Sequence, residues 1–531
     1  MADNYKSGAP YALSGKRLVF TNWHFIEAEG GVDWYARSSY VPLWSSSHPY
    51  DPSIMWKPRY PNKGVRLVCR PAVKSAPLFR RDKEWERRGI AATIIKDEGK
   101  FRAWGTTSWH YDKSNPDNGL TYLESDDGFD WTKPNLGICE YKGSKNNNFV
   151  SRDVWQLHPG GVFKDPRAPS SERYKWINQE NFTTEQIACY LQKFPDRVDS
   201  IALARFEKRR EEGAAAMMAG ARGAVSPDGI NWEFIKEPLV LTFTDTHPTC
   251  YYDGILGKYV AYFRDYQTTR QADIDKKYTQ DCMFKGWKRA IGRSESVDFK
   301  AFPLPELVLV PDLSFGPNQL LYTNCKTTIP GAPELHLMFP SVWDTGDDTC
   351  SVVAASSYDG KLWQYLPDGQ VLGTGDYGSW DGGCVFAYPD LLELPNGDFA
   401  LPYTGYDVPH KYPRINCIRN TAYALWPKGR IFGLEAVDEG EFQTVAIVPG
   451  GNKIFINCLT KRAGFVAVEV MDMNGNIIEG RSMQDCIPVF GDCYRRQIAW
   501  AKNDTTGLSP DKALVLRFRM RRAAIFCLDF E

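Results

Sequence analysis

Four acidic residues each stand shortly before a run of residues typical of a β-strand: Glu86, Asp153, Asp245 and Asp381. Two carboxyl groups can cleave a glycosidic bond, because one protonates the leaving oxygen while the other acts as base or nucleophile. Asp245 is the first catalytic candidate, since Asp245-Thr-His-Pro places two titratable side chains just before a strand. Glu86 and Asp381 are the next candidates, and Asp153 is assigned to substrate binding. Acids in such positions also form turns, which is the structural alternative for each.

Cationic, aromatic and amide residues occupy the same stretches or the loops expected beside them. Arginine binds a carboxylate through two parallel hydrogen bonds, so a cluster of this kind would suit a negatively charged sugar such as a uronate. Ordinary solvation of loops is the alternative. Besides Asp153, the predicted substrate-binding residues are His247, His158, His110, Arg264, Trp380, His410, Arg414 and Asn318.

The sequence contains no motif typical of a cofactor or metal site. A phosphate-binding loop, a dinucleotide glycine pattern and a Gly-x-Ser-x-Gly elbow are all absent. The 13 cysteines are scattered without a Cys-x-x-Cys pair, which favours buried free thiols and a reducing compartment. We therefore expect neither a cofactor nor a metal in the reaction.

A short repeated turn organises the elements that would position these residues. Three segments share the pattern Ser-x-Asp-Gly-x-x-Trp: Ser125–Trp131, Ser226–Trp232 and Ser357–Trp363. Asp-Gly between two β-type runs predicts a hairpin turn, because glycine tolerates positive φ and aspartate bonds its own backbone. A degenerate copy lies at Ser294–Phe299. Copies at unequal intervals predict the blades of a β-propeller that carries insertions of different length.

Five repeating units can be laid out, and four is the less favoured count. In a propeller the inner strand of every blade begins at one mouth of the central channel, and the loops between second and third strands open there too. Residues in these places are therefore expected to converge. The predicted inner strands are Ile90–Ile95, Gly160–Phe163, Thr249–Tyr252, Leu320–Thr323 and Gly383–Ala387.

The chain divides into three predicted parts of an all-β protein. Residues 81–438 form a five-bladed β-propeller, and short, turn-separated strands predict a C-terminal β-sandwich over 439–531. Residues 1–80 form an extension whose strand near Leu18 packs on the sandwich. A charged segment at about 184–213 is predicted to be helical, either as a solvated insertion or as a contact in a homo-oligomer.

Composition excludes several kinds of partner. The 531 residues include 64 basic and 65 acidic side chains, for a net charge of −1, which does not suggest nucleic acid or an anionic membrane. No apolar run approaches the ~20 residues of a membrane span. The N-terminus lacks the basic-then-apolar pattern of a signal peptide, which predicts a cytoplasmic location unless a leader has been removed.

Several phrases of the sequence resemble the five-bladed propeller glycoside hydrolases of families 32, 43 and 68. They resemble most a group of bacterial proteins described only as family-32-like hydrolases, which also carry a C-terminal β-sandwich. The resemblance covers most of residues 80–531, and its phrases are Tyr122–Gly137, Gly143–Asn148, Phe163–Pro166, Glu172–Lys175, Lys258–Arg264, Gly292–Ser296 and Leu516–Met520.

The departures from family 32 limit what the resemblance implies. The Trp-Met-Asn-Asp-Pro-Asn-Gly segment and the Glu-Cys motif are absent. Arg-Asp-Pro survives only as Lys164-Asp165-Pro166, which follows its predicted inner strand and so belongs to the opposite end of the channel. The resemblance thus implies the fold and the use of acids at the mouth, but no fructofuranosidase activity. It leaves room for a structural calcium ion, which no residue pattern requires.

Three functions remain open at this point. The first is a glycosidase that removes a terminal sugar, with a furanoside favoured by the resemblance. The second is a lyase acting on a uronate-containing saccharide, in which a histidine or tyrosine is the base and arginine neutralises the carboxylate. The third is a sugar-binding propeller without catalysis.

Overall fold

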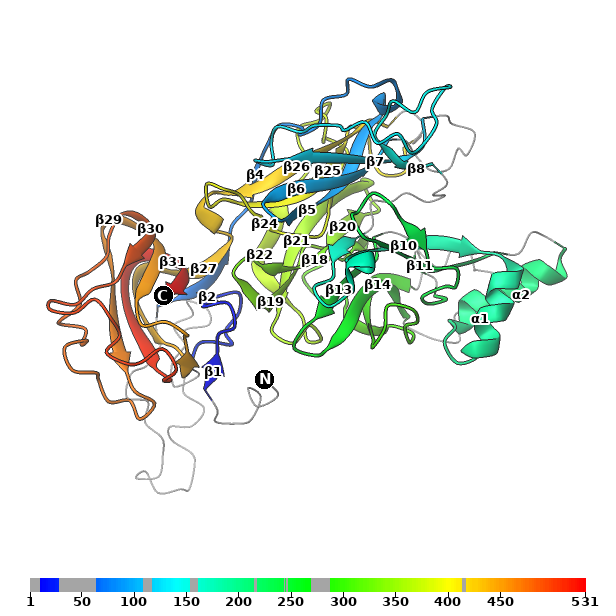
Figure 1. Ribbon diagram of the computed structural model, residues 1–531. Helices are drawn as coiled ribbons and strands as arrows, with labels where there is room; N and C mark the ends of the chain where they lie inside the picture. The colour runs from blue at the N-terminus through cyan, green and yellow to red at the C-terminus, as the bar shows by residue number, and fades with distance from the viewer. Residues whose placement is uncertain are drawn as a thin grey trace.

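The computed structural model describes residues 10–27, 64–107, 117–152, 161–213, 217–242, 244, 247–268, 287–412 and 417–531. Within these ranges the chain is nearly all β, which confirms the all-β part of the predicted fold class. The two α-helices of this described part, α1 (Thr184–Lys193) and α2 (Ser200–Glu211), lie in the segment where the sequence predicts helix. Figure 1 shows them projecting at the opposite side of the molecule from the C-terminal strands. No helix among the described residues is long and apolar enough to cross a membrane.

Three successive groups of four antiparallel strands follow one another between residues 89 and 309 (Figure 1). The first group is β5 (Gly89–Asp97), β6 (Lys100–Thr106), β7 (Leu120–Ser125) and β8 (Phe149–Ser151). The second is β9 (Val162–Lys164), β10 (Tyr174–Phe182), β11 (Met218–Ser226) and β12 (Glu233–Phe234). The third is β13 (Thr249–Asp253), β14 (Lys258–Thr268), β15 (Trp287–Ser296) and β16 (Glu306–Leu309).

Two further groups complete the series. The fourth is β17 (Gln319–Thr323), β18 (Lys326–Ile329), β19 (Ala332–Met338), β20 (Ser341–Asp344), β21 (Thr349–Ser357) and β22 (Gln364–Leu372). The fifth is β23 (Cys384–Ala387), β24 (Leu392–Glu393), β25 (Phe399–Tyr406) and β26 (Arg419–Trp426). Its outer strand is β4 (Val73–Lys74), which comes from the N-terminal part and pairs with β26. Because β26 also pairs with β5, the last group is hydrogen-bonded to the first.

The three Ser-x-Asp-Gly-x-x-Trp segments form the same turn. In the second, the Gly229 amide donates to Ser226 Oγ at 2.9 Å and the Ile230 amide to Asp228 Oδ1 at 2.8 Å. The Trp232 indole then donates to the Gly229 carbonyl at 2.9 Å. The turns beginning at Ser125 and Ser357 repeat these bonds.

An aromatic side chain of the preceding group also donates to the glycine carbonyl of two of these turns. Trp104 Nε1 of β6 lies 2.5 Å from the Gly229 oxygen. Tyr262 Oη of β14 lies 2.7 Å from the Gly360 oxygen. The turns therefore connect neighbouring groups as well as neighbouring strands.

The C-terminal strands form one six-stranded sheet with strands from the N-terminal part of the chain. Its hydrogen-bonded order is β3 (Arg66–Cys69), β27 (Phe432–Gln443), β31 (Val515–Phe530), β29 (Ile454–Met471) and β30 (Asp492–Gln497). β2 (Arg17–Val19) pairs with β31, which places Leu18 opposite Leu528. A separate pair joins β1 (Tyr11–Ala12) to β28 (Ile447–Val448). A continuous apolar core connects this sheet with the fourth and fifth groups.

Candidate active site

Two buried arginines of the third group lie against one tyrosine of the fourth. The Arg264 and Arg289 guanidinium carbons are 4.9 and 4.7 Å from the Tyr322 ring centroid, and Arg289 is also 5.1 Å from the Trp343 ring. Arg264 and Arg289 project from the same face of the β14–β15 pair, because Arg264 lies opposite Ile291 and Tyr266 lies opposite Arg289. Cation–π attraction is strong in such a desolvated place.

His410, in the loop after β25, extends this set of side chains. Its imidazole is buried, with ring centroids 4.6 Å from Tyr322 and 5.3 Å from Trp343. Asp348 fixes the arrangement: its carboxylate accepts the Trp343 indole N–H at 2.9 Å, and its carbonyl accepts the His410 amide at 2.9 Å. Asp348 adopts a φ of 62°, a conformation that costs free energy for a residue with a side chain.

A third buried arginine lies on the fifth group, next to two phenols. Arg419 is opposite Tyr406 in the β25–β26 pair, so both side chains lie on the same face. Burial raises the pKa of Tyr406 well above its ordinary value, and Arg419 opposes that rise. Burial likewise raises the pKa of Tyr388 to about 12. Both phenols are therefore protonated at neutral pH and can donate hydrogen bonds.

His247, just before β13, stacks on Tyr388 with ring centroids 4.8 Å apart. It is buried, and its φ of 55° lies in the left-handed region. The His247 carbonyl accepts Asn324 Nδ2 at 2.9 Å, which ties this strained residue to the fourth group. Such strain is held only where surrounding contacts enforce it, and it is frequent at functional sites.

Contacts and electrostatic interactions connect these residues. Tyr322 contacts Arg264, Arg289 and His410. Besides burial, the pKa of Tyr406 is shifted by Tyr388, Arg419 and Tyr322, which connects the fifth group to the same set. We call the set the mouth cluster; it consists of His247, Arg264, Arg289, Tyr322, Trp343, Tyr388, Tyr406, His410 and Arg419. Its cations and phenolic donors form an arrangement that can bind a carboxylate.

Asp265 on β14 directly follows Arg264, a member of the mouth cluster, in the sequence. Its side chain projects from the opposite face of that strand. Burial raises the pKa of Asp265 to about 6, which the hydrogen bond from the Tyr266 amide opposes. A carboxyl group with such a pKa can act as a general acid near neutral pH.

The structure brings three of the predicted binding residues, His247, Arg264 and His410, into the mouth cluster. Asn318 is exposed, and its carbonyl accepts the Thr345 amide at 3.0 Å. Trp380 stacks on Tyr403 at 5.8 Å, against the large apolar core. The other predicted residues lie outside the described part of the chain: Asp245, Asp153, His158, His110 and Arg414.

Glu86 is fully buried at the end of a 3₁₀ turn, η2 (Glu84–Glu86). Its Oε2 accepts Lys133 Nζ at 2.7 Å and the Lys83 amide at 3.2 Å. Burial raises the pKa of Glu86, while Lys133 opposes the rise. The neighbouring Trp85 packs on Phe149 of β8 at 5.3 Å, on the outer side of the first group.

Asp381 is also buried and also bound to a lysine. Its Oδ2 lies 2.7 Å from Lys74 Nζ and accepts the Tyr403 hydroxyl at 3.2 Å. Because Lys74 belongs to β4, this ion pair holds β4, the outer strand, against the fifth group. Glu86 and Asp381 thus belong to separate ion pairs. The catalytic roles assigned to Asp245, Glu86 and Asp381 stay predictions.

Sequence reasoning missed six members of the mouth cluster: Arg289, Arg419, Tyr322, Trp343, Tyr388 and Tyr406. The signal that could have found the two arginines is their position, because each stands at the start of the strand that is third across the sheet of its group, β15 and β26. Within the described ranges, no cluster of three or more His, Cys, Asp or Glu side chains is arranged to hold a metal ion.

No protein-family model and no curated protein matches the chain. Solved structures show distant similarity. One, described only as a glycoside hydrolase, has a TM-score of 0.41 and 12% identity, with coverage of 67% of this chain and 92% of that one. An N-acetylgalactosamine deacetylase from F. plautii, in complex with blood group B trisaccharide, gives 0.37 and 14%, with coverage of 68% and 95%. A Bombyx mori GH32 β-fructofuranosidase gives 0.37 and 9%, with coverage of 82% and 90%. These values do not assign a family.

Proposed function

We propose that the five groups of strands are the blades of a β-propeller, that the C-terminal sheet folds into a β-sandwich, and that the protein hydrolyses a glycosidic bond of an acidic saccharide at the mouth cluster. The order of the strands supports the first part, since the strands within each group are antiparallel. β4 adds an outer strand to the fifth group by pairing with β26, and β26 also pairs with β5 of the first group. The second part is supported by the long, bulged strands β29 and β31, which can bend from one layer into another.

The observation that carries the functional proposal is the concentration of buried arginines on aromatic rings. Arg264 and Arg289 share the Tyr322 ring, and Arg419 lies beside Tyr406. A uronate carboxylate fits this environment through paired N–H···O bonds, and the ring faces offer apolar contact to the sugar. The low dielectric of the site strengthens the charge pairing.

Hydrolysis needs a proton donor and a second carboxylate. Asp265 faces away from a sugar held by Arg264 and Arg289, because its side chain projects from the opposite face of β14. The proposal therefore takes its donor from the acids that the sequence predicts. Asp245 is the proposed base or nucleophile, as the sequence predicts. The proposal invokes no cofactor.

A lyase on the same acidic saccharide is the second candidate. The observation that favours it is the His247–Tyr388 stack beside Arg419, because a lyase needs a base at the carbon next to the carboxylate and a cation on the carboxylate. In that reaction the base removes the proton, a carbon–carbon double bond forms and the glycosidic oxygen leaves.

One experiment separates these functions. Acidic and neutral oligosaccharides are incubated with the protein, and products are measured by mass and ultraviolet absorbance. We expect cleavage of a uronate-containing substrate with the gain of one water per bond. Products without added water that absorb as unsaturated uronates would replace the hydrolase by the lyase. Binding of a saccharide without turnover would exclude both enzymatic functions and favour a sugar-binding propeller without catalysis.

Two arginine variants test the substrate class. Arg289→Lys keeps the charge but removes the bidentate geometry, and it should lower kcat/KM on an acidic substrate by about 10- to 100-fold. Arg519→Lys is the matched control, because Arg519 is half exposed and pairs with Glu441 on the C-terminal sheet. An equal effect of the two variants would refute the role of Arg289.

A further inference from the structure

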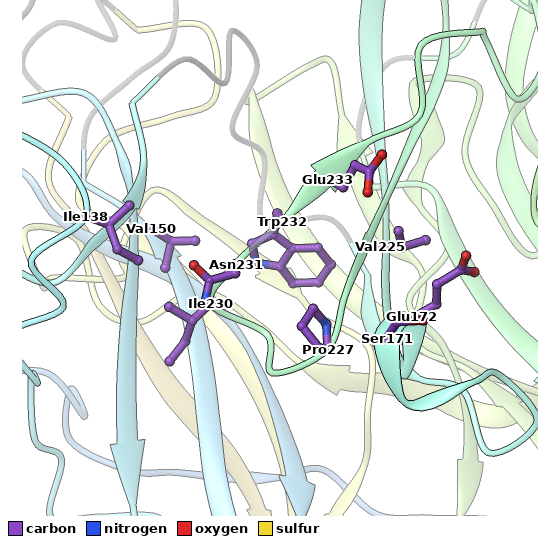
Figure 2. A pocket seen from close by; sticks show the side chains of 10 residues that line it. All are labelled: Ile138, Val150, Ser171, Glu172, Val225, Pro227, Ile230, Asn231, Trp232 and Glu233. Atoms are coloured by element: carbon purple, nitrogen blue, oxygen red, sulfur yellow. The ribbon is translucent and has the colours of Figure 1, made fainter.

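A cavity of about 430 Å³ lies at the seam between the first and second groups of strands, and none of its lining residues belongs to the mouth cluster. We call it the seam groove. Figure 2 shows the Trp232 indole in its centre, with Ile138 and Val150 on one side and Ser171 and Glu172 on the other. Its volume falls in the range of ~300–1,000 Å³ that small-molecule sites occupy.

The Trp232 ring is held in place before any ligand arrives. Its Nε1–H is bonded to the Gly229 carbonyl at 2.9 Å, and its ring packs edge-on against Trp176 at 6.0 Å. The indole keeps a partly exposed surface toward the groove. A fixed aromatic surface lowers the entropy lost on binding and suits the flat C–H face of a sugar ring.

Polar groups around the ring can bond sugar hydroxyls. Asn231 and Glu233 flank Trp232 and are exposed, and Ser171 lies across the groove. The side-chain N–H of Asn231 donates to Asp228 Oδ2 at 2.7 Å, which fixes the orientation of the Asn231 side chain. Its side-chain oxygen can then accept a hydrogen bond from a ligand. A few oriented polar groups around an apolar surface are typical of a site that recognises a small polar ring.

The charge of the groove selects among sugars. Glu172 and Glu233 line it, and its lining contains no lysine or arginine. Glu172 is held by Lys175 at 3.2 Å, whereas Glu233 forms no ion pair with any described residue. These carboxylates accept hydroxyl donors but repel a uronate. We propose that the seam groove is a second binding site, specific for neutral saccharides and independent of the reaction at the mouth cluster.

The test is calorimetric titration of the full chain with neutral trisaccharides built from glucose, xylose, arabinose or galactose, and with a galacturonate trimer. We expect at least one neutral trimer to bind. Trp232→Ala should weaken this binding by about tenfold or more, which corresponds to ~1.4 kcal/mol. If no neutral trimer binds, the proposal fails.

Trp363→Ala is the matched control. Trp363 occupies the same position in its own turn, is likewise half-buried, and bonds the Gly360 carbonyl at 3.0 Å. Both variants therefore lose the same turn contact, but only Trp232 lines the groove. Equal weakening by the two variants would overturn the proposal.

Glu233→Gln tests the charge argument without touching the turn. The variant is compared in an Arg289→Lys background, which should weaken uronate binding at the mouth cluster. Glu233→Gln should leave the affinity for the neutral trimer within about threefold and raise the affinity for galacturonate. A galacturonate affinity that stays unchanged would overturn the assigned role of the charge. Because binding is measured without turnover, the result is separate from the outcome of the product analysis at the mouth cluster.

Discussion

Gly229→Ala should destabilise the protein more than the same substitution at Gly128, although both glycines occupy the same place in their turns. Both have positive φ, 77° and 86°. A methyl group at Gly229 would stand 2.6 Å from the Trp104 indole, whereas at Gly128 the nearest atoms are at 3.4 Å, an ordinary contact. Trp104 is fully buried and bonded to the Gly229 carbonyl, so it cannot move aside.

The magnitudes follow from two separate costs. Placing alanine at positive φ costs about 1 kcal/mol in either turn. Overpacking against Trp104 adds about 1–3 kcal/mol at Gly229. We therefore expect Gly229→Ala to lower the free energy of unfolding by about 2–4 kcal/mol and Gly128→Ala by about 1 kcal/mol.

The assay is urea unfolding followed by circular dichroism, with Trp104→Phe as the second arm of a double-mutant cycle. Phenylalanine lacks the part of the indole that the new methyl group would meet. In the Trp104→Phe background, Gly229→Ala should therefore cost only as much as Gly128→Ala. Equal midpoint shifts for the two alanine variants in the unmodified chain would refute the idea that this turn is packed between neighbouring groups.

Three further predictions concern ionisable groups. Lys74→Met should lower the free energy of unfolding, measured by urea titration, by about 2–3 kcal/mol, because Asp381 is left buried without its cation. A loss of turnover with unchanged stability would instead favour a catalytic role for Asp381. Glu295 is partly buried, yet Arg293 and Lys258 lower its pKa to about 2, so its stabilising contribution is present above pH 4.5 and is lost as the pH falls toward 2. Unfolding titrations from pH 6 to 2 should show a steeper decline of stability in the unmodified chain than in Glu295→Gln. Burial raises the pKa of Asp265 to about 6, so its neutral form stabilises the fold and that contribution is lost as the pH rises through about 6. Unfolding titrations from pH 4 to 8 should show a smaller loss of stability in Asp265→Asn than in the unmodified chain.

The turns and the all-β class could be predicted because their causes are local. Each Ser-x-Asp-Gly-x-x-Trp turn closes with hydrogen bonds among residues no more than three positions apart. Even the degenerate copy keeps part of this pattern, since the Lys300 amide donates to Asp298 Oδ1 at 3.1 Å with Phe299 where glycine stands elsewhere. What a single turn cannot encode is its partner in the neighbouring group, such as Trp104 for Gly229.

The acids show the limit of the same reasoning. Glu86 and Asp381 do stand before strands, as the sequence indicates, but the lysines that bind them come from 47 and 307 residues away along the sequence. A position before a strand identifies an end of the molecule, whereas the ion pair depends on which distant segment folds there. Arg264, His247 and His410 were found because strand ends converge. Arg289 and Arg419 were missed because the starts of the strands that are third across their sheets were not considered.

The mouth cluster and the seam groove differ in charge, and this difference gives the two proposed sites different sugar preferences. In the proposal, Arg264, Arg289 and Arg419 would attract a uronate, while Glu172 and Glu233 would repel it. Charge attraction between exposed groups is screened within about 8–10 Å at physiological ionic strength, so each site acts on the sugar unit directly in contact with it. The two sites also lie at opposite ends of their strand groups. Glu172 and Trp232 follow the ends of β9 and β11, whereas Arg289 and Arg419 stand at the starts of β15 and β26. We therefore expect the sites to act independently, so that occupying one should leave the affinity of the other unchanged.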